Sequence, residues 1–557
     1  MKVLIGSVLI MKKTISVILA TLLLAALALS GCSKEAADPA KERYLASDSS
    51  TVVTYIKDDD GNIVPSGVAT RGSLVTIQGK TVTQEEINYE PCKVDEETTI
   101  YYCETDLVET LEECVRETDK YVRTPATTYV TPGECDIAGF LPKGTHVSIT
   151  GFDGMKDGVV TMYKVSADGG NEAWVYNKYL VDSQDAANAV NQEYYDLNKD
   201  KIYDGMDLYG GSPANLDYFP YDKTVTSDKT QPSEVRAYYL NAGCIDGIEY
   251  YIDCAKEAGA NALVIDIKDG NLAYHADVAK DYTPSSYENA YHNNEDYKAG
   301  IAKVKDAGLW AIGRIVVFND QYFADDNPDE CILEYGENQG WPSAYSRKAW
   351  EYNVKLAISA VKEMGFDEIQ FDYVRFPENS YGLSDSGAAD FRNRYNEEKA
   401  QAVQNFCFYA TDSIHAAGAY FSVDVFGECS DGYVTAYGQY WPAISNIVDA
   451  VSSMPYIDHF GREANTWQDG YSTMYNWAKG AAEAQQITPN PAAARTWLTC
   501  YAVPYWDPEI YVTAGFLSDQ IQGLWDAGIG SGGFITWNVA SNLDIYYTVV
   551  PAFQAQY

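Results

Sequence analysis

The stretch Glu-Ile-Gln-Phe-Asp-Tyr-Val at 368–374 has the two-residue alternation of a β-strand and decides the fold of the C-terminal half. Apolar and aromatic side chains share one face of this strand, whereas Gln370 and Asp372 share the other. Amphipathic helical patterns flank it at 347–364 and 391–417. A strand between two helices is the repeating unit of α/β proteins.

The same alternation of strands and helices extends outward from this stretch over residues 233–557. The other candidate strands are Val235–Leu240, Ala262–Lys268, Trp310–Phe318, Tyr420–Phe426, Ile447–Met454, Thr496–Ala502 and Gly533–Trp537. The other helical patterns cover 246–258, 295–307, 470–485 and 516–527. Eight strands over about 325 residues predict an α/β fold of the (β/α)₈ or TIM-barrel type. A doubly wound sheet is the alternative, but Leu240–Cys244 lacks the Gly-rich turn typical of it.

A weak internal repeat precedes the barrel, with copies at 51–120 and 121–182. The segments Leu74–Ile77, Cys92–Val94 and Tyr102–Val108 of the first copy correspond to Val147–Ile149, Tyr163–Val165 and Trp174–Val181 of the second. Short alternating strands separated by turn residues predict small all-β barrels. The second copy resembles a bacterial SH3-like domain, and such domains often bind cell-wall peptides. A spacer or a docking surface against the barrel is the alternative role.

Two polar segments connect these parts of the chain. Residues 33–50 are small and polar, and we expect a tether. Residues 183–232 form a polar linker with a short helical pattern at 192–198. The acidic residues 196–207 partly match the spacing of a calcium loop but lack its Gly and its terminal Glu, so a plain acidic connector is the alternative.

The N-terminus has the organisation of a bacterial export signal. Lys12 and Lys13 precede an apolar segment at 15–28, and the sequence then reads Leu29-Ser-Gly-Cys32. The apolar segment is short for a spanning helix. The last four residues resemble a lipobox, which implies that residues 1–32 are a lipoprotein signal peptide and that Cys32 receives the lipid. We therefore expect an extracytoplasmic protein anchored to the cell membrane through Cys32; an ordinary secretory signal is the alternative.

The composition narrows the classes of partner. The 557 residues carry a formal net charge of −40, which disfavours nucleic acid and loose adhesion to anionic lipid. Export makes disulfides possible for the ten cysteines after Cys32, but no Cys-x-x-Cys spacing suggests a zinc ribbon or thioredoxin-like chemistry. Five histidines lack metal-binding spacing, and no phosphate-binding loop or Gly-x-Ser-x-Gly occurs. We expect no metal and no organic cofactor.

Active sites of TIM barrels lie at the carboxyl ends of the strands, so we searched there for polar and aromatic residues. The candidate substrate-binding residues are Asp266, Lys268, Asp269, Arg314, Tyr373, Arg375, Glu428, Tyr456, Trp537 and Asn538. The strand period predicts that Asp266 shares a face with Lys268, and Ser422 with Asp424. Because isolated charges are costly to bury, we expect Asp266, Lys268, Arg314, Asp372 and Asp424 to pair within one ring.

Three motifs together resemble a bacterial family assigned to the TIM-barrel glycoside hydrolases. Residues 365–377, Gly-Phe-Asp-Glu-Ile-Gln-Phe-Asp-Tyr-Val-Arg-Phe-Pro, are similar to its signature. Asn261–Asp269 and Ser422–Gly427 are similar to its motifs on the second and fifth strands. The resemblance covers 233–557 and implies hydrolysis of a glycan, which we expect to be a cell-wall or extracellular polysaccharide.

Glycoside hydrolysis normally uses two carboxyl groups, one as proton donor and one as nucleophile or base. We predict that Asp372 is the nucleophile or base, kept ionised by Arg314 or Arg375, and that Asp424 is the acid. Glu428 is the alternative acid. The chain departs from the α-amylase pattern, in which an Arg precedes the strand-four Asp by two residues. Two other functions remain open, a non-catalytic glycan- or peptidoglycan-binding lipoprotein and a transglycosidase.

Overall fold

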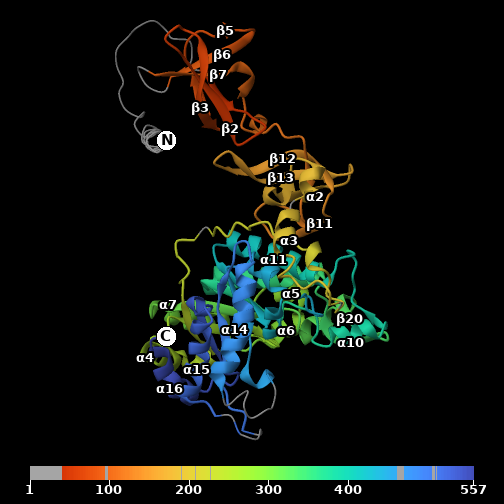
Figure 1. Cartoon of the computed structure of the whole chain (residues 1–557), viewed down its shortest axis with the longest axis vertical. Helices are drawn as coiled ribbons and strands as arrows, with labels where there is room; N and C mark the ends of the chain where they lie inside the picture. The colour runs from red at the N-terminus through yellow and green to blue at the C-terminus, as the bar shows by residue number, and fades with distance from the viewer. Residues whose placement is uncertain are drawn as a thin grey trace. The chain divides into compact units, whose positions relative to one another are not determined.

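The computed structural model describes residues 41–93, 98–189, 191–206, 208–225, 227–460, 469–504, 509 and 511–557. The predicted signal peptide and Cys32 lie outside these ranges. The chain divides into two compact units, residues 1–116 with 157–159 and residues 117–156 with 160–557 (Figure 1). No helix in the described ranges is both long enough and apolar enough to cross a membrane.

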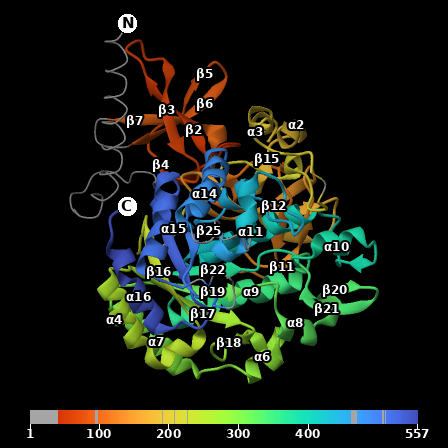
Figure 2. The same ribbon diagram turned by 60° about the horizontal axis from the view of Figure 1, so that its bottom comes forward.

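The C-terminal part is a nearly closed parallel barrel of TIM type, as the sequence predicts. Its strands are β16 (Val235–Leu240), β17 (Ala262–Asp269), β19 (Trp310–Val316), β22 (Glu368–Asp372), β24 (Tyr420–Phe426), β25 (Ala450–Met454), β27 (Thr496–Thr499) and β28 (Gly533–Trp537). Neighbouring strands pair in parallel from β16 round to β25, and β28 pairs with both β16 and β27, so that among the described residues the barrel stays unpaired between β25 and β27. Between the sixth and seventh strands, the short β26 (Ala493–Ala494) pairs with β25 and leads into β27. Figure 2 shows β16, β17, β19 and β22 side by side.

Helices surround the barrel. The longer ones are α4 (Ile248–Ala258), α7 (Asn294–Asp306), α9 (Arg347–Ser359), α11 (Lys399–Ala416), α14 (Gly470–Gln486), α15 (Ala514–Asp526) and α16 (Leu543–Gln554). The short ones are α5 (Ala279–Tyr282), α6 (Pro284–Glu288), α8 (Gln321–Asp326), α10 (Ser380–Asp385) and α12 (Trp441–Ser445). The helix predicted from residue 391 begins only at Lys399, because Glu398 and Gln401 cap it reciprocally.

A small sheet lies in the insertions that follow the third and fourth barrel strands. Strand β20 (Cys331–Glu334) pairs with β21 (Glu337–Pro342) and with β23 (Ala389–Asp390). The sheet brings Trp341 near Tyr373, with ring centroids 6.0 Å apart, so it extends the wall above the end of β22.

The interior of the barrel changes from ionic and apolar at the amino end to polar at the carboxyl end. Glu368 and Arg495 form a buried ion pair of 2.6 Å at the amino end. Trp310 donates to the same glutamate at 3.0 Å, which offsets part of the cost of burying it. Apolar side chains fill the next layer. They are Val235, Ala237, Ala262, Val264, Ile312, Trp497 and Ile535.

Two all-β sheets precede the barrel and share one strand order. The first contains β1 (Lys41–Leu45), β2 (Thr51–Lys57), β3 (Ile63–Thr70), β4 (Leu74–Ile77), β5 (Val82–Gln84), β6 (Ile87–Lys93), β7 (Thr99–Cys103) and β8 (Leu107–Val108). The second contains β9 (Asp119–Val122), β10 (Ala126–Tyr129), β11 (Ile137–Leu141), β12 (His146–Lys156), β13 (Val159–Ala167), β14 (Glu172–Tyr176) and β15 (Leu180–Val181).

The orders are β3-β2-β7-β6-β4-β1-β8 and β11-β10-β14-β13-β12-β9-β15, with β5 paired beside β6. Each position of the first sheet has its counterpart in the second, as the internal repeat predicts. Strand β1 begins at Lys41, inside the segment expected to be a tether. The SH3-like identity of these sheets stays a prediction.

The second sheet and the segment after it pack against the barrel. Arg123 forms a buried ion pair of 2.5 Å with Asp217. Tyr179 donates to Asp412 of α11 at 2.6 Å, and Tyr221 donates to the same carboxylate. The linker at 183–232 contains α2 (Gln184–Ala189) and α3 (Gln192–Asn198), and several of its side chains are buried. This packing favours a docking role for the second β-sheet.

Closure of the barrel depends on Gly533, and its replacement tests this. A Cβ on Gly533 would lie 1.9 Å from the Val235 carbonyl oxygen, and the φ angle of 92° disfavours any side chain. We expect Gly533→Ala to lower the free energy of unfolding by about 3 kcal/mol or more. Gly528→Ala is the matched control, because its φ is 84° but open space surrounds it; it should cost about 1 kcal/mol. Equal losses in chemical denaturation would contradict this explanation.

Candidate functional site

Asp372 is held at the carboxyl end of β22 by a two-point contact with Arg314. The Arg314 Nε and Nη2 atoms donate to its Oδ2 at 3.2 and 2.7 Å. The backbone N–H of Tyr373 donates to its Oδ1 at 2.6 Å. Tyr373 has a φ of 55°, a left-handed conformation that is uncommon for an aromatic residue. A two-point contact of this kind fixes the position of the Asp372 carboxyl group.

Arg314 also binds the two acids at the end of β17. Its Nη1 donates to Asp266 at 2.7 Å and to Asp269 at 3.2 Å. The Tyr239 hydroxyl donates to the other oxygen of Asp266 at 2.5 Å. Burial raises the pKa of Asp266 to about 6, although Arg314 opposes the shift. Of the five charged residues predicted to pair, Asp266, Arg314 and Asp372 form one cluster, and Asp269 joins them.

Lys268 does not share this cluster, so the predicted common face with Asp266 is wrong. The pairing of β17 with β19 is irregular between Asp266 and Lys268, and such a bulge turns the following side chain to another face. The Lys268 ammonium instead donates to Asp320 at 2.5 Å and to Asn353 of α9 at 2.8 Å. Lys268 thus lies between the barrel and its helices.

Arg375 also points away from Asp372 and lies among aromatic rings. Its guanidinium is 4.1 Å from the ring centroid of Phe426 and 4.7 Å from that of Tyr373. It donates to Glu378 at 3.0 Å. Of the two arginines proposed to hold Asp372 ionised, Arg314 is the one that contacts it.

Asp424 lies on β24, and its contacts differ from those of Asp372, which binds an arginine. Its Oδ1 accepts hydrogen bonds from Gln370 at 2.7 Å and from Trp497 at 2.8 Å. Its Oδ2 is buried and has no hydrogen-bond partner in the described part of the chain. Burial raises the pKa of Asp424 well above the usual range, and the negative charge of Asp372 raises it further. The contact from Trp497 was not foreseen from the sequence.

The aromatic candidates line the same end of the barrel. The Trp537 ring is 4.4 Å from the ring of Tyr239, and Arg314 lies 5.3 Å from its centroid. Tyr456 is stacked with Trp537 at 6.3 Å. Asn538 is buried and donates to the Asn542 carbonyl at 3.3 Å, a contact that serves the turn before α16.

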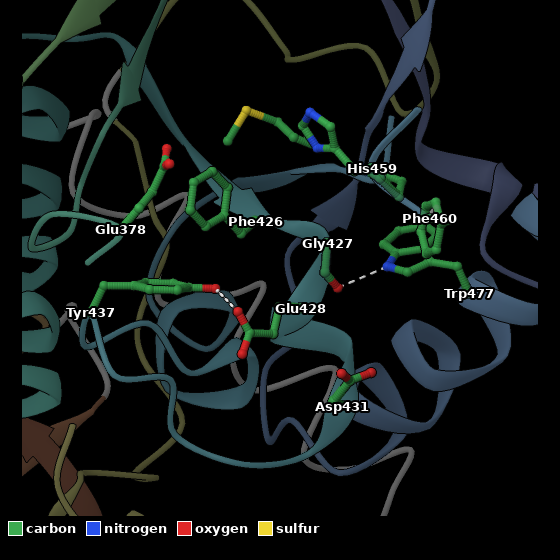
Figure 3. A pocket seen from close by; sticks show the side chains of 11 residues that line it. Glu378, Phe426, Gly427, Glu428, Asp431, Tyr437, His459, Phe460 and Trp477 are labelled. Carbon is green, nitrogen blue, oxygen red and sulfur yellow. Dashed lines mark hydrogen bonds between the residues drawn. The ribbon is translucent and has the colours of Figure 1, made fainter. Parts of the chain in front are cut away.

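A cavity of about 630 Å³ opens beside this cluster, where β24 and β25 end. Glu428 lines it, together with Phe426 and Tyr437 (Figure 3). The hydroxyls of Tyr433 and Tyr437 donate to the two oxygens of Glu428 at 2.7 and 2.8 Å. Asp372 and Asp424 are more deeply buried and do not line this cavity.

The described residues contain no group of three or more His, Cys, Asp or Glu side chains placed to hold a metal ion. In the acidic connector, Asp204 accepts hydrogen bonds from Tyr195 and Ser212, both at 2.8 Å, and Asp207 lies outside the described ranges. The ten cysteines after Cys32 are all free thiols. The disulfides that export would permit are therefore not formed here.

A comparison with protein families identifies the C-terminal part of the chain. A family model described as "Putative glycosyl hydrolase domain" (DUF4015) matches residues 238–543, more than half of the chain. No curated protein matches the chain.

Several solved structures are similar at low TM-scores. The glycoside hydrolase domain of PgaB (BpsB) from Bordetella bronchiseptica is 13% identical, with 57% of this chain and 99% of that chain covered and a TM-score of 0.41. A GH20 exo β-N-acetylglucosaminidase from Vibrio harveyi is 11% identical, with 57% and 54% covered and a TM-score of 0.37. A hypothetical protein from Ruminiclostridium thermocellum is 26% identical, with 34% and 97% covered and a TM-score of 0.29.

The raised pKa of Asp424 makes a prediction about stability. A carboxyl that keeps its proton in the folded state stabilises the protein below its unfolded pKa of about 3.9, and this contribution is lost as the pH rises towards the folded pKa. Asn resembles the protonated acid and does not titrate. We therefore expect Asp424→Asn to gain about 1.4 kcal/mol per pH unit relative to the parent above about pH 4.

Unfolding measured between about pH 4 and pH 7 tests this expectation. Asp269→Asn is the matched control, because the Asp269 side chain is 44% exposed and lies in the same cluster. Its stability should run nearly parallel to that of the parent. Parallel curves for Asp424→Asn as well would mean that Asp424 is ionised in the folded protein.

Proposed function

The chain belongs to the DUF4015 family of glycosyl hydrolase domains, and from this premise we propose that it hydrolyses a cell-wall or extracellular polysaccharide. The observation that carries the proposal is the contrast between two carboxyl groups on neighbouring strands. Asp372 accepts two hydrogen bonds from Arg314, whereas the pKa of Asp424 is raised by burial. Carboxyl pairs with divergent environments are how glycosidases separate the acid from the nucleophile or base.

In the proposed reaction, Asp424 gives its proton to the leaving glycosidic oxygen. Its Oδ2 is the oxygen suited to this step, because Oδ1 already accepts from Gln370 and Trp497. Asp372 attacks the anomeric carbon or removes a proton from the attacking water. Arg314 holds the Asp372 carboxyl group in position for this step. Because both carboxyls are buried, the glycan has to displace side chains at the strand ends to reach them.

Glu428 suits the role of acid less well. It is exposed, and two phenol hydroxyls donate to its two oxygens. Both oxygens of Glu428 are therefore engaged by neutral donors, whereas Oδ2 of Asp424 has no hydrogen-bond partner among the described residues. We therefore assign Glu428 to the surroundings of the glycan and retain Asp424 as the acid.

Reducing-sugar release from a panel of wall and extracellular polysaccharides tests the proposal. We expect Asp372→Asn and Asp424→Asn each to lower kcat by about 10²–10⁴-fold, because each removes one member of the acid and base pair. Glu428→Gln should retain most of kcat. The kcat of the parent should fall as the pH rises through the pKa of Asp424.

Each other outcome has a definite meaning. Full activity of Asp372→Asn would remove the assigned nucleophile or base. Loss of activity in Glu428→Gln with retention in Asp424→Asn would transfer the role of acid to Glu428. The Asp269→Asn variant again serves as the control for a carboxylate that contacts Arg314 but takes no part in proton transfer.

A non-catalytic glycan-binding protein is the second candidate function. The observation that favours it is that the Asp424 side chain is fully buried, as expected for a structural network. Tight binding of a polysaccharide without release of reducing ends, and unchanged binding by Asp424→Asn, would support this function over hydrolysis.

We further propose that the protein is exported and anchored through a lipid on Cys32, with the two β-sheets next to the cell wall. The proposal is supported by the lipobox-like sequence at 29–32 and by the net charge of −40. The all-β repeat at 51–182 would then contact peptidoglycan or hold the barrel away from the membrane. The experiment for this part is separate from the activity assay.

Replacement of Cys32 tests the anchor. We expect Cys32→Ser to abolish incorporation of a fatty-acid label and to release the protein from the membrane fraction, because the thiol is the site of lipid attachment. Cys92→Ser is a matched control, since Cys92 is buried within the first sheet. A lipid label that persists in Cys32→Ser would contradict the lipoprotein assignment.

A further inference from the structure

The cavity beside the carboxyl cluster opens where β24 and β25 end, and β24 carries the proposed acid. Phe426 is the last residue of β24 and Gly427 follows it, and Asp424 lies two residues before Phe426 on the same strand. Met454 is likewise the last residue of β25, and Pro455 follows it. Carboxyl ends of parallel strands meet at one face of a barrel, so the cavity and the proposed reaction centre share that face.

The size and walls of the cavity suit a sugar unit. Its volume of about 630 Å³ lies within the range of small-ligand sites, roughly 300–1,000 Å³. Four aromatic residues line it, and they are Phe426, Tyr437, Phe460 and Trp477. The Trp477 indole N–H donates to the Gly427 carbonyl at 2.8 Å, which fixes that ring in the wall (Figure 3). Fixed aromatic rings give flat apolar surfaces for the C–H faces of a sugar.

The charged residues of the cavity restrict the kind of sugar that fits more than the aromatic walls do. Three carboxylates line it, those of Glu378, Glu428 and Asp431, and the lining residues include no lysine or arginine within the described part of the chain. The Arg375 guanidinium forms an ion pair of 3.0 Å with Glu378 and so compensates the charge of that carboxylate. Within the described ranges, Glu428 receives hydrogen bonds from the neutral hydroxyls of Tyr433 and Tyr437 alone.

The charges of the two remaining carboxylates, Glu428 and Asp431, repel each other. Partial burial raises the pKa of Asp431, and the nearby charge of Glu428 raises it further. Like charges kept close together in a partly buried cavity destabilise the empty site, and a bound cation relieves this repulsion. A metal ion is an unsuitable occupant, because the described residues do not form a metal-binding group of three.

We propose that this cavity is a subsite for a sugar unit that carries a protonated amine, so that the substrate is a glycan with free amino sugars. The aromatic walls hold the ring, and the carboxylates of Glu428 and Asp431 accept hydrogen bonds from the ammonium group. An N-acetylated sugar brings a neutral amide and leaves the repulsion between the two acids in place. The inference rests on the proposed function, because it assigns the cavity to the same glycan.

Binding of two matched oligosaccharides to the full chain tests this subsite. The ligands are 1,4-linked tetramers of glucosamine and of N-acetylglucosamine, titrated by calorimetry at about pH 6. The protein carries Asp424→Asn, which prevents turnover and which we expect to fold stably; the parent is titrated in parallel at low temperature. We expect the glucosamine tetramer to bind at least tenfold more tightly, and added salt to weaken it selectively.

The variant Glu428→Gln with Asp431→Asn should reduce the preference to about onefold, because it removes both charges and keeps both shapes. Glu295→Gln, an exposed carboxylate on α7, should leave the preference unchanged. Equal binding of the two tetramers overturns the inference. So does a preference that persists in the double variant, or binding of neither tetramer.

The inference and the proposed function can fail separately. Cleavage of neutral glycans without any amine preference would keep the hydrolase proposal and remove the amine subsite. An amine preference without cleavage by the parent would keep the subsite and identify the protein as a binder of amino-sugar polymers.

Discussion

The buried guanidinium of Arg314 links the carboxyl ends of three neighbouring barrel strands. It extends from β19 to Asp266 on β17 and to Asp372 on β22, both at 2.7 Å. Asp424, on the next strand, accepts instead from the neutral groups of Gln370 and Trp497. Burial and the charge of Asp372 raise the pKa of Asp424 well above its usual range. The position of this arginine therefore gives the two carboxyl groups different surroundings.

The barrel was predictable from the sequence because its strands show a two-residue alternation and because amphipathic helical patterns lie between them. In β24, alternate residues face the helices and the barrel interior, and the observed bounds Tyr420–Phe426 equal the predicted ones. Predictions failed where local contacts override periodicity. Residues 391–398 have a helical pattern, but the cap formed by Glu398 and Gln401 starts the helix only at Lys399. Helix α16 was missed because Pro551 lies inside it.

The site was predictable only in part, for reasons that differ from residue to residue. Asp372 and Arg314 were found because strand-end charges in a barrel have to pair with each other. The position of Lys268 was missed because a bulge in β17 leaves no mark on the pattern of residues. The role of Trp497 was missed because an indole in an apolar strand gives no indication of what its N–H contacts. Such partners depend on the three-dimensional packing.

The free thiols have a consequence for how the protein matures. Nine of the ten cysteines after Cys32 are buried, and Cys103 is partly buried. Burial raises the pKa of many of these thiols, Cys92 and Cys254 among them, each to about 12, which suppresses the reactive thiolate. They therefore act as small apolar side chains of the core. A fold held together in this way needs no disulfide among these ten cysteines.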